Sequence, residues 1–91
     1  MPGSNNAYKS TKVLIEAGHI TQFNQIFDTV RRTNLATDLG MNYQTLVYRI
    51  NRPVAFSLEE LFAIARLIDV EPLVIIQLVL AQIANKKKGK S

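Results

Sequence analysis

The chain has 91 residues, of which 47% are apolar, a size that supports one hydrophobic core and is too small for two. Its formal net charge of +4 favours an anionic partner without identifying one. There is no cysteine, which excludes disulfides and thiolate metal sites and is compatible with a reducing compartment.

Three parts of different composition follow one another along the chain. Residues 1–10 are polar and lack the apolar stretch of a secretory signal, so we expect a flexible N-terminal arm there. Residues 11–85 should form the folded domain, and residues 86–91 a disordered basic tail. The most apolar run, 73–83, is shorter than the about 20 residues that span a bilayer, so we expect a cytoplasmic protein with no membrane partner.

The folded part shows helical spacing of apolar residues and no segment that predicts a β-strand. A short first helix should end before Gly18, and a second helix over about 21–30 should begin with Thr21 as its N-cap. The pattern Ser-x-x-Glu over residues 57–60 is a capping box that starts a later helix, and Pro72 suits the first turn of the last one. We predict an all-α fold, a compact bundle of five to six short helices.

The middle of the chain has the spacing of two helices that meet across a tight turn. Ala36 is small where the helices approach closely, Gly40 can end the first helix in the left-handed conformation, and Leu46 packs from the second. Asn42 can cap this second helix, which we place over residues 43–50. The prediction is a central helix-turn-helix, an arrangement that places its second helix in the DNA major groove.

These motifs in this order resemble the phage-repressor-like family of helix-turn-helix proteins, especially its small bacterial and mobile-element members. The resemblance covers about residues 20–72 and rests on segments 23–30 (FNQIFDTV), 35–43 (LATDLGMNY), 51–53 (NRP), 58–61 (LEEL) and 65–70 (ARLIDV). Arg49 departs from the family pattern, which has an apolar residue three after Leu46, and Ile50 follows it. The resemblance implies a bacterial or phage-encoded DNA-binding protein that regulates transcription.

The outward face of the second helix carries side chains that can read base edges. A glutamine can form two hydrogen bonds to adenine, an arginine two to guanine, and a threonine methyl group can meet that of thymine. We predict these base contacts: Tyr43, Gln44, Thr45, Tyr48 and Arg49. By resemblance, the first four carry most of the readout. The alternative is a solvated helix face, with the tyrosines packed at the edge of the core.

Basic residues gather around this motif. Residues 31–52 hold four arginines and one acidic residue, whereas residues 53–85 hold four acidic residues and one arginine. Exposed amides and the helix dipole at the start of the first helix of the motif favour a phosphate. We predict these phosphate contacts: Arg31, Arg32, Thr33, Asn34 and Arg52. Plain solubilising charge is the alternative for Arg31 and Arg32.

The last helix, over residues 73–83, is apolar on more than one face. One stripe is expected to pack on the core: Leu73, Ile76, Leu80 and Ile83. A second stripe is predicted to form the interface of a two-fold homodimer: Ile75, Leu78 and Val79. Such a dimer would space its recognition helices about 34–36 Å apart for two half-sites. The alternative is that residues 13–15 cover this stripe.

No set of residues supports catalysis. His19 is the only histidine and has no second ligand or nucleophile spaced to act with it, and no glycine-rich phosphate loop is present. We therefore predict no enzyme, no catalytic residue, no metal and no cofactor. The leading prediction is a sequence-specific binder of double-stranded DNA that acts as a repressor or regulator. The alternatives are a protein-interaction module, such as an antitoxin or adaptor that uses the apolar C-terminal helix, and a nonspecific nucleic-acid-associated protein.

Overall fold

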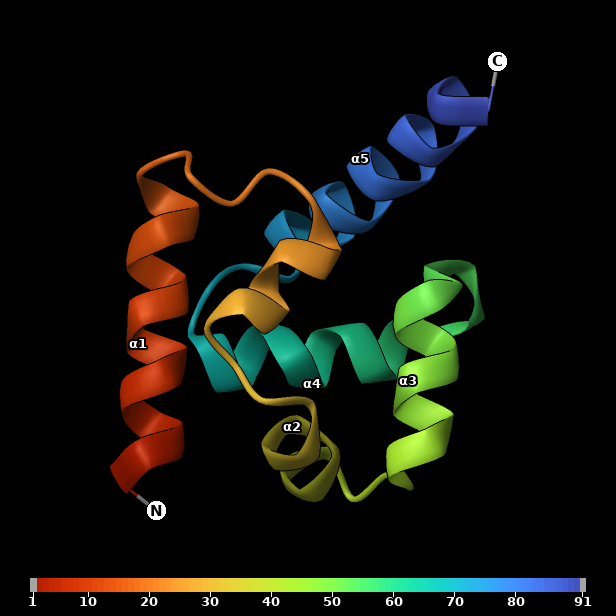
Figure 1. Ribbon diagram of the computed structural model, residues 1–91. Helices are drawn as coiled ribbons and strands as arrows, with labels where there is room; N and C mark the ends of the chain where they lie inside the picture. Colours follow the sequence, from red (N-terminus) through yellow and green to blue (C-terminus); the bar gives the residue numbers. More distant parts are fainter. Residues whose placement is uncertain (1, 91) are drawn as a thin grey trace.

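The computed structural model describes the backbone of residues 2–90 and the side chains of residues 7–85 (Figure 1). In chain order its elements are α1 (Pro2–Glu16), the 3-10 helix η1 (Phe23–Asp28), α2 (Arg32–Leu39), α3 (Tyr43–Asn51), the 3-10 helix η2 (Pro53–Ala55), α4 (Leu58–Ile68) and α5 (Pro72–Lys90). No strand occurs within this described part of the chain. The prediction of a compact all-α bundle is confirmed.

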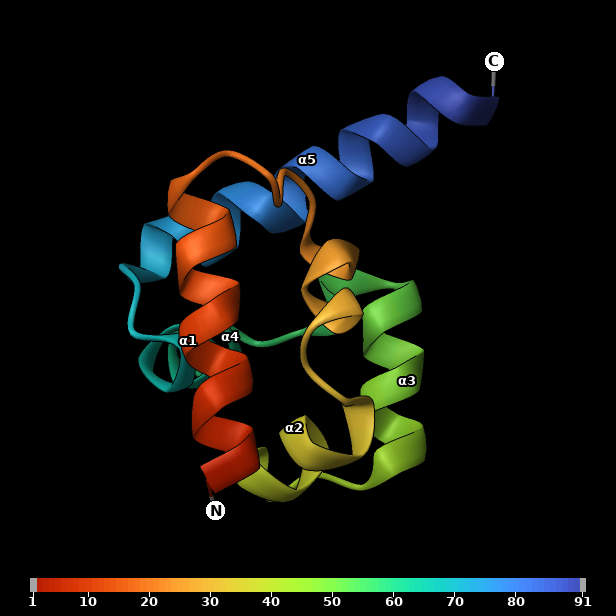
Figure 2. The ribbon, with the colours of Figure 1, turned by 60° about the vertical axis from the view of Figure 1, so that its left-hand side comes forward.

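Helix α4 lies at the centre of the core. It contacts α1, α2 and α5, and its Ile64 and Ala65 are fully buried. Figures 1 and 2 show α1 on one side of the molecule and α3 on the other. Phe23 of η1 completes the core through edge-to-face contacts, with its ring centre 5.6 Å from that of Phe27 and 5.3 Å from that of Phe56.

Local signals set several helix ends as predicted. The Ser57 hydroxyl accepts the N–H of Glu60 at 3.1 Å, and the Glu60 carboxylate accepts the N–H of Ser57 at 2.9 Å, which completes the capping box of α4. Gly18, with φ of 83°, follows the end of α1. Asp69 ends α4 with φ of 71°, a left-handed conformation that aspartate tolerates better than most residues.

The helix predicted over residues 21–30 is shorter and of another type. Only Phe23–Asp28 is helical, as a 3-10 helix, and Thr21 is not its N-cap. The Gln25 side-chain oxygen accepts the N–H groups of Thr21 at 2.7 Å and of Gln22 at 3.2 Å. A side chain from within η1 therefore satisfies the two amides that precede this helix.

The expectation of a flexible arm over residues 1–10 is wrong for the described part of this segment. Helix α1 begins at Pro2, and Tyr8 is only 5% exposed. The Tyr8 hydroxyl donates a hydrogen bond to the carboxylate of Asp38 in α2 at 2.6 Å. Burial raises the pKa of Tyr8 above its usual value of 10.0, and the hydrogen bond to Asp38 and the charge of that carboxylate raise it further.

Two more polar contacts fix α1 to the rest of the fold. The buried hydroxyl of Thr11 lies 2.6 Å from that of Thr29, just after η1. Lys12 donates a hydrogen bond to the Asp69 carboxylate at 2.9 Å, and this bond, together with the negative charge of Asp69, raises the pKa of Lys12. Side-chain contacts thus tie α1 to the segment after η1, to α2 and to the end of α4.

The residues predicted to form a dimer interface on α5 are wrong. Ile75, Leu78 and Val79 are 0%, 7% and 5% exposed and belong to the core of a single chain. Leu73 and Leu80, which we expected inside, are 60% and 58% exposed. Because α5 is apolar around most of its circumference, the period of its sequence does not determine which face turns inward.

Helix α5 continues to Lys90, where we expected a disordered tail over residues 86–91. The side chains of residues 86–90, and all of Ser91, lie outside the described residues. Within residues 2–90, no single helix is both long and apolar enough to cross a membrane. Helices α4 and α5 meet such a criterion only as a pair, across a bend of 114°.

Candidate nucleic-acid interface

A tight turn packs α2 against α3. Gly40 ends α2 with φ of 67°, and the N–H of Met41 donates to the carbonyl oxygen of Ala36 at 2.8 Å. Ala36 and Leu46 are 3% and 0% exposed, so a small and a large side chain fill the contact between the two helices. The predicted helix-turn-helix is thus formed by residues 32–51.

Asn42 caps α3, as predicted. Its side-chain oxygen accepts the N–H groups of Gln44 at 2.8 Å and of Thr45 at 3.4 Å. Helix α3 then runs over Tyr43–Asn51 with one face in the core. The cap therefore fixes the turn that carries the first predicted base contacts.

The outward face of α3 brings together three of the five predicted base contacts. Tyr43 is 46% exposed, Tyr48 is 57% exposed, and Gln44 is also exposed. Gln44 and Tyr48 are one turn apart, so they follow one line along the helix. Two tyrosines and an amide therefore project from a rigid element.

Thr45 is half-buried and contributes less to this outward face. Two further residues of α3 that reach its surface were not among the predicted contacts: Val47, which is half-buried, and Asn51, which is exposed. Both follow Tyr43 at intervals of four residues, so helical spacing alone could have indicated them.

Arg49 is held by α4. Its guanidinium forms an ion pair with the carboxylate of Glu60, and the two side chains are 26% and 28% exposed. The same carboxylate caps α4 through the N–H of Ser57. A charged side chain with an internal partner therefore stands where the resemblance led us to expect an apolar one, and it links α3 to the start of α4.

Three arginines are exposed around the motif. Arg31 immediately precedes α2, and its side chain makes no capping bond. Arg32 begins α2, with its guanidinium carbon 5.4 Å from the centre of the Phe27 ring. Arg52 follows the end of α3. The other predicted phosphate contacts lie in the first turn of α2: Thr33, which is exposed, and Asn34, which is half-buried.

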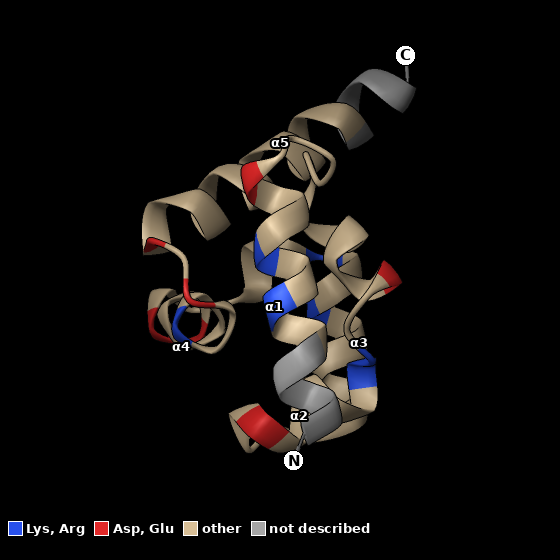
Figure 3. Cartoon of the chain, turned by 90° about the vertical axis from the view of Figure 1, so that its left-hand side faces the viewer, with Lys and Arg blue, Asp and Glu red and all other residues tan. Residues whose placement is uncertain are grey.

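Charge is unevenly distributed over the fold. Figure 3 shows acidic residues on α4 and on the segment that leads to α5, and basic residues beside α3. Helix α3 itself contains no acidic residue. An anionic partner would therefore meet less repulsion at α3 than at α4.

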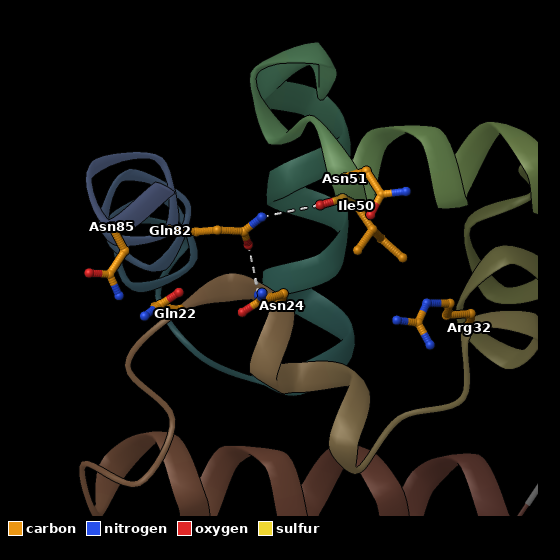
Figure 4. Close-up of a pocket in the computed structure, with 7 residues that line it drawn as sticks. All are labelled: Gln22, Asn24, Arg32, Ile50, Asn51, Gln82 and Asn85. Carbon is orange, nitrogen blue, oxygen red and sulfur yellow. Dashed lines mark hydrogen bonds between the residues drawn. The ribbon is translucent and has the colours of Figure 1, made fainter. Parts of the chain in front are cut away.

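A polar cleft of about 440 Å³ lies between α5, η1 and the ends of the two motif helices (Figure 4). Five of the side chains that line it are amides. Its lining residues are Gln22, Asn24, Arg32, Ile50, Asn51, Gln82 and Asn85. Figure 4 shows the guanidinium of Arg32 reaching toward this cleft from α2.

Gln82 forms the wall of the cleft and is only 8% exposed. Its side-chain oxygen accepts the N–H of Asn24 at 2.9 Å, and its amide nitrogen donates to the carbonyl oxygen of Ile50 at 3.2 Å (Figure 4). The two bonds fasten α5 to η1 and to the end of α3. From the sequence, Gln82 is only an interruption of an apolar run.

No three histidine, cysteine, aspartate or glutamate side chains among the described residues are placed to hold a metal ion. No protein family, no curated protein and no solved structure matches this chain. The function therefore has to be inferred from the residues and their geometry.

Proposed function

We propose that this protein binds double-stranded DNA with α3 in the major groove and reads the base sequence there. The observation that supports this most is the outward face of α3, where Tyr43, Gln44 and Tyr48 project from a helix that α2 holds from behind. A major groove about 12 Å wide admits an α-helix. Side chains that project from such a helix come within hydrogen-bonding range of base edges.

Gln44 is the principal reader in this proposal. It is exposed in the first turn of α3, and a glutamine amide can form two hydrogen bonds to adenine. Tyr43 and Tyr48 flank it and offer apolar ring edges to thymine methyl groups. Thr45, which is half-buried, has a smaller part. Arg49 is not among the proposed base contacts, because Glu60 holds its guanidinium.

Arg31, Arg32 and Arg52 would neutralise phosphates beside the groove. The first amides of α2, at Thr33 and Asn34, add donors for the same purpose, because the first turn of a helix has no internal acceptors for them. Arg32 rests on the Phe27 ring, which reduces the side-chain freedom that binding would remove. Such contacts position the protein and carry no sequence information.

Regulation of transcription is the use of this binding that we propose. A protein seated on a short duplex site excludes other proteins from it, so repression is the simplest outcome. The resemblance to phage-repressor-like proteins supports the same proposal.

Selection of bound duplexes from a random pool, at two salt concentrations, tests the proposal. We expect one sequence motif to be enriched, and total binding to weaken as salt rises. Gln44→Ala should relax the enriched motif at one base pair while the protein remains folded. A folded wild-type protein that enriches no motif would contradict sequence-specific binding.

A second candidate function is a protein-interaction module, which the exposed Leu73 and Leu80 on α5 favour. An antitoxin or adaptor of this kind would bind its partner through α5 and would not discriminate between duplexes. The selection experiment separates the two candidates, because only the DNA-binding proposal predicts an enriched motif that depends on Gln44.

A further inference from the structure

Helix α5 exposes a line of side chains on the side away from the core. Leu73 and Leu80 are 60% and 58% exposed, and Gln77 and Ala84 are exposed as well. The spacing of four, three and four residues keeps them on one line along the helix. We call these four residues the outer line of α5.

The flanks of the outer line are apolar. Half-buried residues border it on both sides: Ile76 and Ile83 on one, Val74 and Ala81 on the other. No charged residue occurs over residues 72–85. A helix face that only meets water normally carries charged side chains, so the outer line is unusual for a solvated surface.

Charged residues of opposite sign stand at the two ends of this uncharged stretch. Glu71 lies just before α5, and lysines occupy positions 86–88 of the sequence, whereas Asp69 is already paired with Lys12. A parallel pair of α5 helices would bring the lysines of both copies together. An antiparallel pair brings the acidic end of one helix beside the basic end of the other and also aligns the helix dipoles favourably.

We propose that the outer line of α5 is the contact surface for a second copy of this chain, packed antiparallel. Centred between positions 78 and 79, this pairing places Leu73 of one copy over Ala84 of the other, and Gln77 over Leu80. A large side chain then faces a small one at each end of the contact, which lets the helices approach closely. Glu71 comes level with position 86 of the second copy.

Another exposed apolar pair lies on α4, where Leu58 and Phe62 are 63% and 41% exposed. This pair spans one turn, and the exposed Glu59 and Arg66 border it. The outer line spans about three turns without a charge. A second copy therefore covers a longer stretch without charged side chains on α5 than on α4, and within it only Gln77 is polar.

Sedimentation equilibrium without DNA tests the surface. Wild-type protein should dimerise, and Leu80→Glu or the milder Leu80→Gln should weaken association by at least about tenfold. Val13→Glu is the matched control, because Val13 on α1 is 62% exposed, about as much as Leu80. This variant should leave association unchanged, as should Gln44→Ala. Monomeric wild type, or a dimer lost in Phe62→Glu and kept in both folded Leu80 variants, would overturn the proposal.

Disulfide crosslinking tests the orientation, because the chain contains no cysteine of its own. Under mild oxidation, Leu73→Cys mixed with Ala84→Cys should form a crosslinked heterodimer, and neither variant should crosslink with itself. A disulfide requires β-carbons within about 4.5 Å, so it reports direct apposition. Self-crosslinking of Leu73→Cys, or no crosslink in any mixture of folded proteins, would overturn the antiparallel pairing. Both readouts are independent of DNA binding, so either proposal can fail alone.

Discussion

Helices α3 and α5 each bury one face, but they differ in what they expose. Helix α3 presents an amide and two tyrosines on a turn fixed by Asn42, whereas α5 presents leucines with no charge among them. Hydrogen-bonding groups discriminate between polar partners, because an unmatched donor or acceptor is costly to bury. Aliphatic side chains gain from burial of almost any apolar surface. We therefore propose DNA as the partner of α3 and a protein surface as the partner of α5.

The two faces of α5 should respond very differently to truncation. Ile75→Ala should cost about 2–5 kcal/mol of unfolding free energy, because it removes buried methyl groups and leaves a cavity. Leu73→Ala, on the outer line, should cost about 0.5 kcal/mol or less. Urea unfolding at low protein concentration measures both. Equal costs would contradict the inward and outward faces assigned to α5.

Gln82 should be the polar residue on which the position of α5 depends most. Gln82→Leu removes the partners of the Asn24 N–H and the Ile50 carbonyl oxygen and should cost about 1–3 kcal/mol. Asn85→Leu, one turn further along α5 and exposed, is the control and should change stability by about 0.5 kcal/mol at most. A Gln82 variant as stable as this control would show that the two bonds contribute little.

Arg49 should affect stability and leave sequence preference unchanged, in contrast to Gln44. A double-mutant cycle with Arg49→Met and Glu60→Gln should give a coupling energy of about 1 kcal/mol, because the ion pair is partly shielded from water. The duplex motif selected by Arg49→Met should match that of the wild type. A changed motif would show that Arg49 contributes to the reading of the base sequence.

The smallest effect is expected at Tyr8, and it depends on pH. The pKa of Tyr8 in the folded protein is raised above 10.0. The contribution of this residue to the free energy of unfolding is therefore fully present below pH 10.0 and is lost as the pH rises further. Tyr8→Phe should cost about 0.5–1 kcal/mol at neutral pH, because Asp38 is exposed and keeps its water. The difference between wild type and variant should shrink above pH 10.0 in chemical unfolding. A difference that stays constant with pH would contradict the role of this hydrogen bond.

The helix-turn-helix and the start of α4 were predictable because their determinants are local. Gly40 adopts the positive φ that its position requires, and Asn42 and Ser57 cap the helices that follow them. Each of these features depends on residues at most a few positions away. The outward position of Gln44 followed from the same local period.

The predictions that were wrong concerned residues whose partners are distant in the sequence. Tyr8 is buried in the core and donates a hydrogen bond to Asp38, thirty residues later, so the sequence of this polar N-terminal segment did not predict its contacts. Arg49 finds Glu60 on another helix. The inward face of α5 is selected by the shape of the core and by the bonds of Gln82, neither of which the apolar period contains.

The most direct test of the account is the ratio of affinities for a selected duplex and for a scrambled one. Gln44→Ala should lower this ratio by the equivalent of about 1–3 kcal/mol and leave binding to the scrambled duplex unchanged. Arg32→Ala should weaken binding to both duplexes equally. It should also reduce the slope of the logarithm of the affinity against the logarithm of the salt concentration by about one. Ser10→Ala, exposed on α1, is the control. An unchanged ratio in folded Gln44→Ala would contradict the claim that α3 reads DNA.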